Sequence, residues 1–131
     1  MALVLVIDDE ARFRELVREV LQEAGHQVVD APDGRVGFRM FLDHRPDLVI
    51  MDLFMPEQEG IETIRQIRAE APDIRIIAMS GGGSYGFTDA LEGVKLLGAD
   101  AALRKPFRNE DLLSTVDAMV ALRPGETTGP R

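Results

Sequence analysis

Two short apolar runs that each end in aspartate constrain the fold of this chain more than any other feature. Leu3–Ile7 contains only leucine and β-branched residues, and it is followed at once by Asp8 and Asp9. Residues 49–51 are also apolar and lead directly to Asp52. Continuous apolar runs of this length are typical of strands buried on both faces. Each run should therefore carry its acids to the rim of a sheet, where three carboxylates repel one another unless a cation lies among them.

The rest of the chain alternates between short apolar runs and stretches with helical periodicity. The apolar runs predict strands at residues 3–7, 28–29, 48–51, 74–79 and 101–103. The amphipathic stretches predict helices at residues 10–24, 34–42, 60–71, 88–97 and 109–122. Strands and helices that alternate at such short spacing predict an α/β fold with a doubly wound, five-stranded parallel sheet.

The chain is expected to form one domain. Its 131 residues are enough to bury a single core, and residues 1–122 contain all the predicted elements. Residues 123–131 have no periodicity and are predicted to form a flexible C-terminal tail.

Composition excludes several classes of function. Fifteen basic residues against 23 acidic ones give a formal net charge of −8, which disfavours binding to nucleic acid or to anionic membranes. The absence of cysteine excludes disulfides, thiol catalysis and cysteine-ligated metals. No apolar stretch approaches the ~18–20 residues that span a bilayer, so a cytoplasmic protein is expected. His26 and His44 lie in polar stretches and are predicted at the surface, neither of them as a phosphodonor.

Five polar residues are predicted at the carboxyl edge of the sheet. They end or closely follow four different strands: Asp8, Asp9, Asp52, Ser80 and Lys105. Open α/β sheets bind ligands at this edge, in the crevice where the strand order reverses. In the doubly wound order 2-1-3-4-5 the reversal falls between the first and third strands, which are the strands that carry the acids.

These residue types favour phosphoryl transfer to a carboxylate. Carboxylates with a main-chain carbonyl and waters make an oxygen-rich site suited to Mg²⁺. Asp52 would be the nucleophile, and the ammonium of Lys105 would stabilise charge on the phosphoryl oxygens. The hydroxyl of Ser80 can donate to the same oxygens.

The motifs resemble the receiver domain of two-component response regulators, with a layout close to that of the single-domain chemotaxis type. The resemblance covers roughly residues 3–122 and rests on five segments: residues 6–10 (VIDDE), 51–56 (MDLFMP) with Gly60, 79–80 (MS), 98–100 (GAD) and 105–107 (KPF). It implies a flavodoxin-like (βα)5 fold with strand order 2-1-3-4-5.

The resemblance also implies a role for each residue of the site. Asp52 is implied as the phosphoacceptor, Lys105 as a contact of the phosphoryl group and Ser80 as the switch hydroxyl. Mg²⁺, with Mn²⁺ as an alternative, is implied at a site with these ligands: Asp9, Asp52, the main-chain carbonyl of Phe54 and, largely through water, Asp8.

The partners follow from the same resemblance. The phosphodonor would be a histidine kinase or a histidine phosphotransfer protein, and output would pass to a downstream protein by contact. The chain would be a phosphoacceptor switch rather than an enzyme. It would be a monomer or a phosphorylation-dependent dimer, with no nucleic-acid or membrane partner.

Two alternative functions remain open. A magnesium-dependent phosphohydrolase would use a second acid two residues after the nucleophile, and Phe54 at that position cannot transfer protons. A degenerate receiver would act only as an interaction module. Ala102 leaves this second alternative open, because receivers usually carry an aromatic residue three positions before the lysine.

Two further expectations follow from the same region. With Ala102 in place of the aromatic, we expect switching by an order–disorder change of the glycine-rich loop 81–86, with Tyr85 as the moving aromatic. Phe54 and Gly82 flank the expected phosphoryl position and cannot activate water, so a long-lived acyl phosphate is expected.

Overall fold

The computed structural model describes residues 1–53, 59–80 and 98–121 of the chain. Its strands are β1 (Leu3–Ile7), β2 (Gln27–Ala31), β3 (Leu48–Asp52), β4 (Arg75–Ser80) and β5 (Ala101–Arg104). Its helices are α1 (Ala11–Glu23), α2 (Gly34–His44), α3 (Glu59–Glu70) and α5 (Asn109–Ala121). The helix predicted at residues 88–97 and the tail predicted at residues 123–131 lie outside the described residues.

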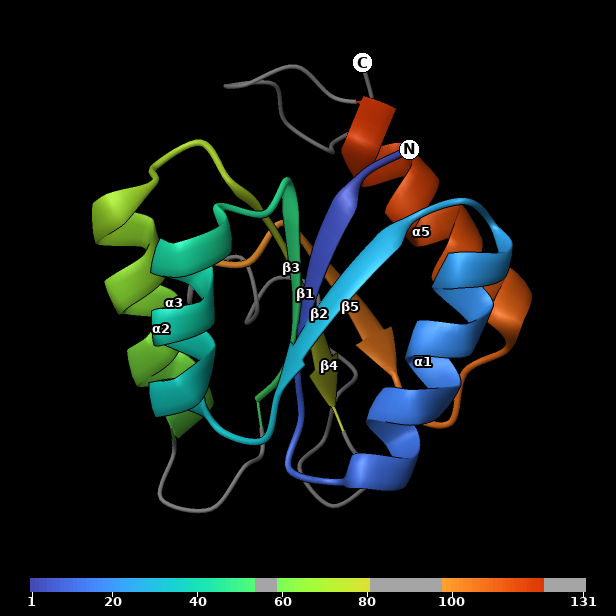
Figure 1. Cartoon of the computed structure of the whole chain (residues 1–131), viewed down its shortest axis with the longest axis horizontal. Coiled ribbons are helices and arrows are strands. Elements are labelled where there is room, and N and C mark those ends of the chain that lie inside the picture. Colours follow the sequence, from blue (N-terminus) through green and yellow to red (C-terminus); the bar gives the residue numbers. More distant parts are fainter. Residues whose placement is uncertain (54–58, 81–97, 122–131) are drawn as a thin grey trace.

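The five strands form one parallel sheet in the order β2-β1-β3-β4-β5, which confirms the predicted fold class. Figure 1 shows α2 and α3 against one face of this sheet and α1 and α5 against the other. The strand order reverses between β1 and β3, whose carboxyl ends point toward the lower edge of the view. The topology therefore places the ends of these two central strands side by side.

Alternation along each strand divides the core into two layers. On β1, Val4 and Val6 pack with residues of α1 and α5, whereas Leu5 and Ile7 pack with residues of α2 and α3. All four side chains are fully buried. A strand with both faces covered needs apolar residues at every position, which is why β1 reads as a continuous apolar run.

Several element boundaries differ from the predictions. Strand β2 is longer than the predicted residues 28–29, and β3 and β4 continue through Asp52 and Ser80. Parallel pairing of Asp52 with Met79 and of Ser80 with Arg104 extends both strands beyond their apolar runs. Asn109 is the first residue of α5, as the predicted range has it, and the main-chain N–H of Arg108 donates to the Asp111 carboxylate at 3.3 Å.

An arginine and an aspartate stabilise the amino edge of the sheet, where strands β4 and β5 begin. Arg68, near the end of α3, forms an ion pair with Asp100 at 2.9 Å and donates to the carbonyl of Gly98 at 2.6 Å. It also donates to the carbonyls of Pro72 and Ile74. A guanidinium can make several such hydrogen bonds at once because its five N–H groups form a rigid planar array. These contacts tie the end of α3 to the segments that enter β4 and β5.

His26 is not the surface residue that its polar neighbours predicted. It is 9% exposed, and its Nδ1 accepts the main-chain N–H of Ala2 at 3.1 Å. Its Nε2 lies 3.9 Å from an Asp117 carboxylate oxygen on α5. The prediction failed because the packing of α5 near the start of β1 is not encoded in the residues around His26. His44 is exposed, as predicted.

None of the described helices is long and apolar enough to cross a membrane.

Gly60, in the first turn of α3, allows the helix to approach the end of β3 closely. A Cβ at this position would lie 2.7 Å from the carbonyl oxygen of Asp52 and 2.9 Å from the Cα of Leu53. Both are main-chain atoms that a side-chain rotation cannot move. The absence of a side chain at Gly60 therefore helps to set the position of the chain around Asp52.

We predict that Gly60→Ala destabilises the protein by about 1–3 kcal/mol, the usual range for a substitution that forces backbone to move. Helix propensity alone would give the opposite sign, because alanine is the better helix former. The free energy of unfolding from urea denaturation measures the effect. Arg65→Ala, at an exposed position of the same helix, is the control and should change stability by less than about 0.5 kcal/mol. An equally stable or more stable Gly60→Ala variant would contradict the prediction and show that α3 can move away from the end of β3 at little cost.

Candidate functional site

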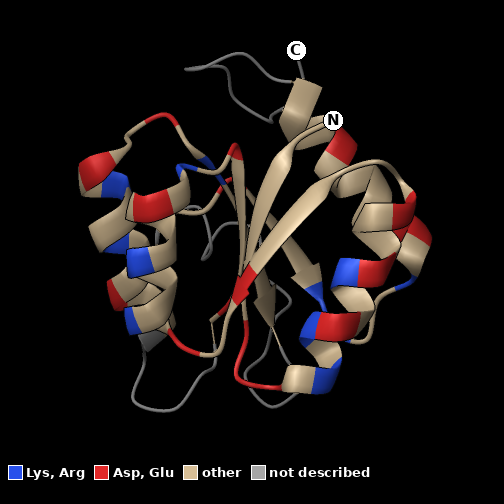
Figure 2. Cartoon of the chain, in the orientation of Figure 1, with Lys and Arg blue, Asp and Glu red and all other residues tan. Residues whose placement is uncertain are grey.

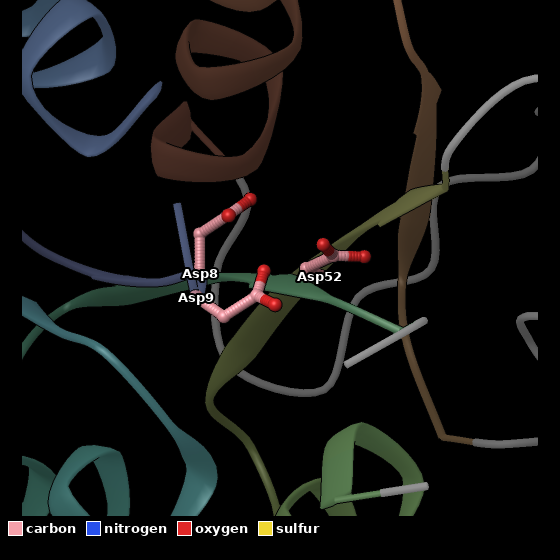
Figure 3. Close-up of side chains that lie close together, drawn as sticks. All are labelled: Asp8, Asp9 and Asp52. Carbon is pink, nitrogen blue, oxygen red and sulfur yellow. The ribbon is translucent and has the colours of Figure 1, made fainter. Parts of the chain in front are cut away.

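Three carboxylates gather where β1 and β3 end. Ile7 pairs with Met51 in the parallel register, so the residues that follow them, Asp8 and Asp52, are neighbours across the two strands. One carboxylate oxygen from each of Asp8, Asp9 and Asp52 lies within 4.8 Å of the others. Figure 3 shows these three side chains close together at the strand ends. Asp8 is fully buried and Asp52 is 7% exposed, whereas Asp9 is exposed. Figure 2 shows the acidic residues at the lower end of β1, where the chain leads into α1.

The ammonium of Lys105 neutralises part of this negative charge. Its Nζ lies 2.7 Å from Oδ2 of Asp8 and 3.4 Å from Oδ2 of Asp52. Burial by itself lowers the pKa of Lys105, but the hydrogen bond to Asp8 and the charge of Asp52 outweigh that effect, and the pKa is raised above its usual value. Lys105 therefore carries its positive charge throughout the neutral pH range.

The Asp8 side chain is fixed by donors at both of its oxygens. The main-chain N–H of Glu10 donates to Oδ1 at 2.9 Å, and Lys105 occupies Oδ2. The main-chain N–H of Asp8 donates in turn to the carbonyl of Ala31 at the end of β2 at 3.1 Å. A buried carboxylate with donors at both oxygens keeps its charge at a defined position, because the hydrogen bonds replace the water it has lost.

Arg14 holds the main chain at Asp8, and the sequence did not single it out. Its guanidinium donates to the Asp8 carbonyl at 2.7 Å through Nη1 and to Asp30 at 3.1 Å through Nε. Arg18 donates to the other oxygen of Asp30 at 2.8 Å. The amphipathic pattern of α1 predicted only a polar face opposite an apolar one, whereas Arg14 and Arg18 of that polar face contact Asp8, just after β1, and residues of β2. Charge alternation in a helix does not reveal which arginines lie beside a strand end.

Phe13, which belongs to the amphipathic helix predicted at residues 10–24, also borders the site. The Nζ of Lys105 lies 4.0 Å from the centre of the Phe13 ring. Phe107 contacts Phe13 in a T-shaped arrangement, with ring centres 5.7 Å apart. The sequence signal for this contact is an aromatic residue four positions after the Asp-Asp pair. Helical periodicity by itself places Phe13 in the core and does not indicate the contact with Lys105.

Ser80 and Lys105 are brought together through the main chain. Ser80 is 3% exposed at the end of β4, and its carbonyl accepts the main-chain N–H of Lys105 at 2.7 Å. Ala102 lies in β5, pairs with Ala78 and is partly buried against the core layer of α2 and α3. Phe54, the glycines at 81–83 and Tyr85 lie outside the described residues.

The carboxylate cluster fits a hard divalent cation. Its donors are carboxylate oxygens, which Mg²⁺ prefers, and they come from the ends of two strands rather than from a long loop. Three acids this close, two of them buried, repel one another strongly unless cations neutralise them. Lys105 supplies one positive charge, so the site retains the capacity to bind another cation.

Comparison with known proteins identifies the family. A sequence model of the response regulator receiver domain matches residues 4–117. A receiver domain protein of Clostridium thermocellum superposes with a TM-score of 0.82 at 30% identity, over 92% of this chain and 94% of that one. The chemotaxis protein CheY4 of Vibrio cholerae gives a TM-score of 0.81 at 32% identity, over 91% and 98%. The chain belongs to the response regulator receiver domain family of two-component signalling.

Curated relatives include longer proteins. Response regulator MprA of Mycolicibacterium vanbaalenii is 35% identical over 117 residues, which is 89% of this chain and 49% of MprA. The transcriptional regulatory protein PhoP of Escherichia coli is 33% identical over 122 residues, which is 93% of this chain and 53% of PhoP. The chain thus spans about half the length of these relatives.

We predict that Arg14→Met lowers the free energy of unfolding by about 1.5–3 kcal/mol, the usual range for hydrogen bonds to charged groups. The substitution leaves the Asp8 carbonyl without the guanidinium and leaves Asp30 with Arg18 alone. Arg12→Met removes the same charge from an exposed position of α1 and should change stability by less than about 0.5 kcal/mol. Urea denaturation of the two variants measures the difference, and equal effects would contradict a specific role for Arg14.

Proposed function

We propose that this receiver domain, formed by residues 1–122, accepts a phosphoryl group on Asp52 from a histidine kinase or a histidine phosphotransfer protein. The observation that carries the proposal is the position of Lys105, whose ammonium reaches Asp52 and Asp8 together. A cation beside a strand-end carboxylate can contact a phosphoryl group carried on that carboxylate. The acid cluster and the family membership support the same chemistry.

The proposed metal site would hold Mg²⁺, with Mn²⁺ as an alternative. Its direct ligands would be Asp9, Asp52 and the main-chain carbonyl of Phe54, and Asp8 would act largely through water. The donors that already occupy both oxygens of Asp8 support this indirect role. When bound, the ion supplies positive charge that offsets the repulsion between the carboxylates and the incoming phosphoryl oxygens.

In the proposed step, a carboxylate oxygen of Asp52 attacks phosphorus in line. The O–P bond forms as the P–N bond of the phosphohistidine breaks, and the imidazole nitrogen leaves with the bonding electrons. Lys105 stabilises negative charge on the transferring oxygens, and the Ser80 hydroxyl donates to one of them once transfer is complete. Lys105 can do this because its raised pKa keeps it charged at the pH of the reaction.

Output is proposed to pass by contact with a downstream protein, with the receiver as a monomer or a phosphorylation-dependent dimer. Ala102 has only a methyl group where an aromatic residue would report the state of Ser80. We propose that the glycine-rich loop after Ser80, with Tyr85, carries the signal instead. An open hollow of about 350 Å³ on β5 and α5 is lined by Ala102, Pro106, Phe107 and neighbouring residues.

We predict that intact mass spectrometry detects the gain of one phosphoryl group after incubation with a small phosphodonor and Mg²⁺. Asp52→Ala should abolish the gain because it removes the nucleophile, and a chelator should abolish it by removing the metal. Asp43→Asn, which removes an exposed carboxylate on α2, is the control and should be phosphorylated normally. A phosphoryl group that persists on Asp52→Ala would refute Asp52 as the acceptor. A native protein that gains no phosphoryl group would favour the interaction module.

We predict that the acyl phosphate is long-lived and that Phe54→Asn shortens its lifetime. Neither Phe54 nor Gly82 can orient or deprotonate a water molecule, whereas an asparagine amide can hydrogen-bond to one. Loss of the phosphoryl group over time, followed by mass after the donor is removed, measures the rate. Faster loss from the native protein than from Phe54→Asn would contradict the prediction.

A further inference from the structure

The ammonium of Lys105 has a third neighbour besides the two carboxylates. It lies 4.0 Å from the centre of the Phe13 ring, well inside the roughly 6 Å range in which a cation is attracted to a ring face. Phe13 is in the first turn of α1, and Phe107 packs against it from the segment that follows Lys105. The ring on α1 is thus in contact with the segment that follows β5, which carries both Lys105 and Phe107.

The ring differs from the carboxylates in one chemical respect that matters for the site. Asp8 and Asp52 are partners of Lys105, and they also belong to the cluster that can hold a divalent cation. A hard cation binds the carboxylate oxygens and repels the ammonium. It does not compete for the face of an apolar ring. Phe13 is therefore a partner that Lys105 can keep when Asp52 binds a metal or accepts a phosphoryl group.

We propose that Phe13 is a positioning residue for Lys105, whose ring face retains the ammonium beside the acid cluster when Asp52 binds the metal or carries a phosphoryl group. The inference rests on the proposed phosphoryl transfer to Asp52. The contact leaves about 2 Å for the ammonium to move before it leaves the range of the ring. Lys105 can therefore shift from Asp8 toward a phosphoryl group on Asp52 without losing Phe13. A leucine at this position would fill the space but would not attract the cation.

The test replaces Phe13 with phenylalanines of increasing ring fluorination, which weaken the negative potential of the ring face and nearly preserve its shape. With phosphoramidate as donor and Mg²⁺ at saturation, the rate of Asp52 phosphorylation should fall with each added fluorine. The most fluorinated ring should lower the rate about threefold to tenfold, while the Mg²⁺ affinity stays the same. A rate that does not depend on fluorination overturns the proposal.

Phe41 provides a matched control. It is a buried ring on α2 that also makes a cation–π contact, with the guanidinium of Arg45 5.4 Å from the ring centre. Fluorination of Phe41 perturbs the same kind of contact on the other side of the sheet and should leave the phosphorylation rate unchanged. An equal loss of rate from fluorinated Phe41 would show a general effect on stability and would overturn the specific role of Phe13.

A second measurement does not depend on phosphorylation or metal. Nuclear magnetic resonance of the metal-free protein should show the ε-methylene protons of Lys105 shifted upfield by the ring current of Phe13. Phe13→Leu should abolish this shift and Phe13→Tyr should keep it. A shift unchanged in Phe13→Leu refutes the contact and with it the proposal. A native protein that takes up no phosphoryl group refutes the proposed function instead, so the two failures can be distinguished.

Discussion

The ion pair of Lys105 with Asp8 and Asp52 is the interaction on which the arrangement of this site depends. The parallel sheet brings two carboxylates together at neighbouring strand ends and buries both, which is costly for unpaired charges. Lys105 offsets this cost from the segment after β5, with Nζ 2.7 Å from Asp8 and 3.4 Å from Asp52. The ion pair that offsets the repulsion between the buried carboxylates therefore also brings a cation to the proposed phosphoacceptor, Asp52.

The residues around this ion pair hold it from three directions. Arg14 and Asp30 fix the main chain at Asp8, the close approach of Gly60 limits the chain at the end of β3, and Phe13 faces the ammonium. At the opposite edge of the sheet, Arg68 and Asp100 tie α3 to the starts of β4 and β5. Side chains of a functional site are held accurately when packing and hydrogen bonds from neighbouring residues fix them, and strands hold them more precisely than loops do.

Much of the fold and of the site could be predicted because both depend on short-range patterns. Continuous apolar runs predicted the buried strands, and the resemblance to receiver domains implied the observed strand order. The sequence predicted strand ends and side-chain burial less well where these depend on contacts between residues far apart in the chain. Asp52 and Ser80 lie inside strands because of their partners Met79 and Arg104, and His26 is buried in part by α5. None of these partners is near in sequence.

The sequence alone led to an acid cluster at one edge of a parallel sheet, with a serine and a lysine from two other strands. It could do so because successive carboxyl ends of parallel strands meet at the same edge, whatever the details of packing. Tertiary structure alone revealed which carboxylate lies nearer to Lys105, that Arg14 reaches the Asp8 carbonyl, and that the ring of Phe13 faces the ammonium. These contacts depend on how α1 is rotated against the sheet and on where the segment after β5 places its side chains. Rotation and placement are set by the packing of the whole core, so no local pattern in the chain records them.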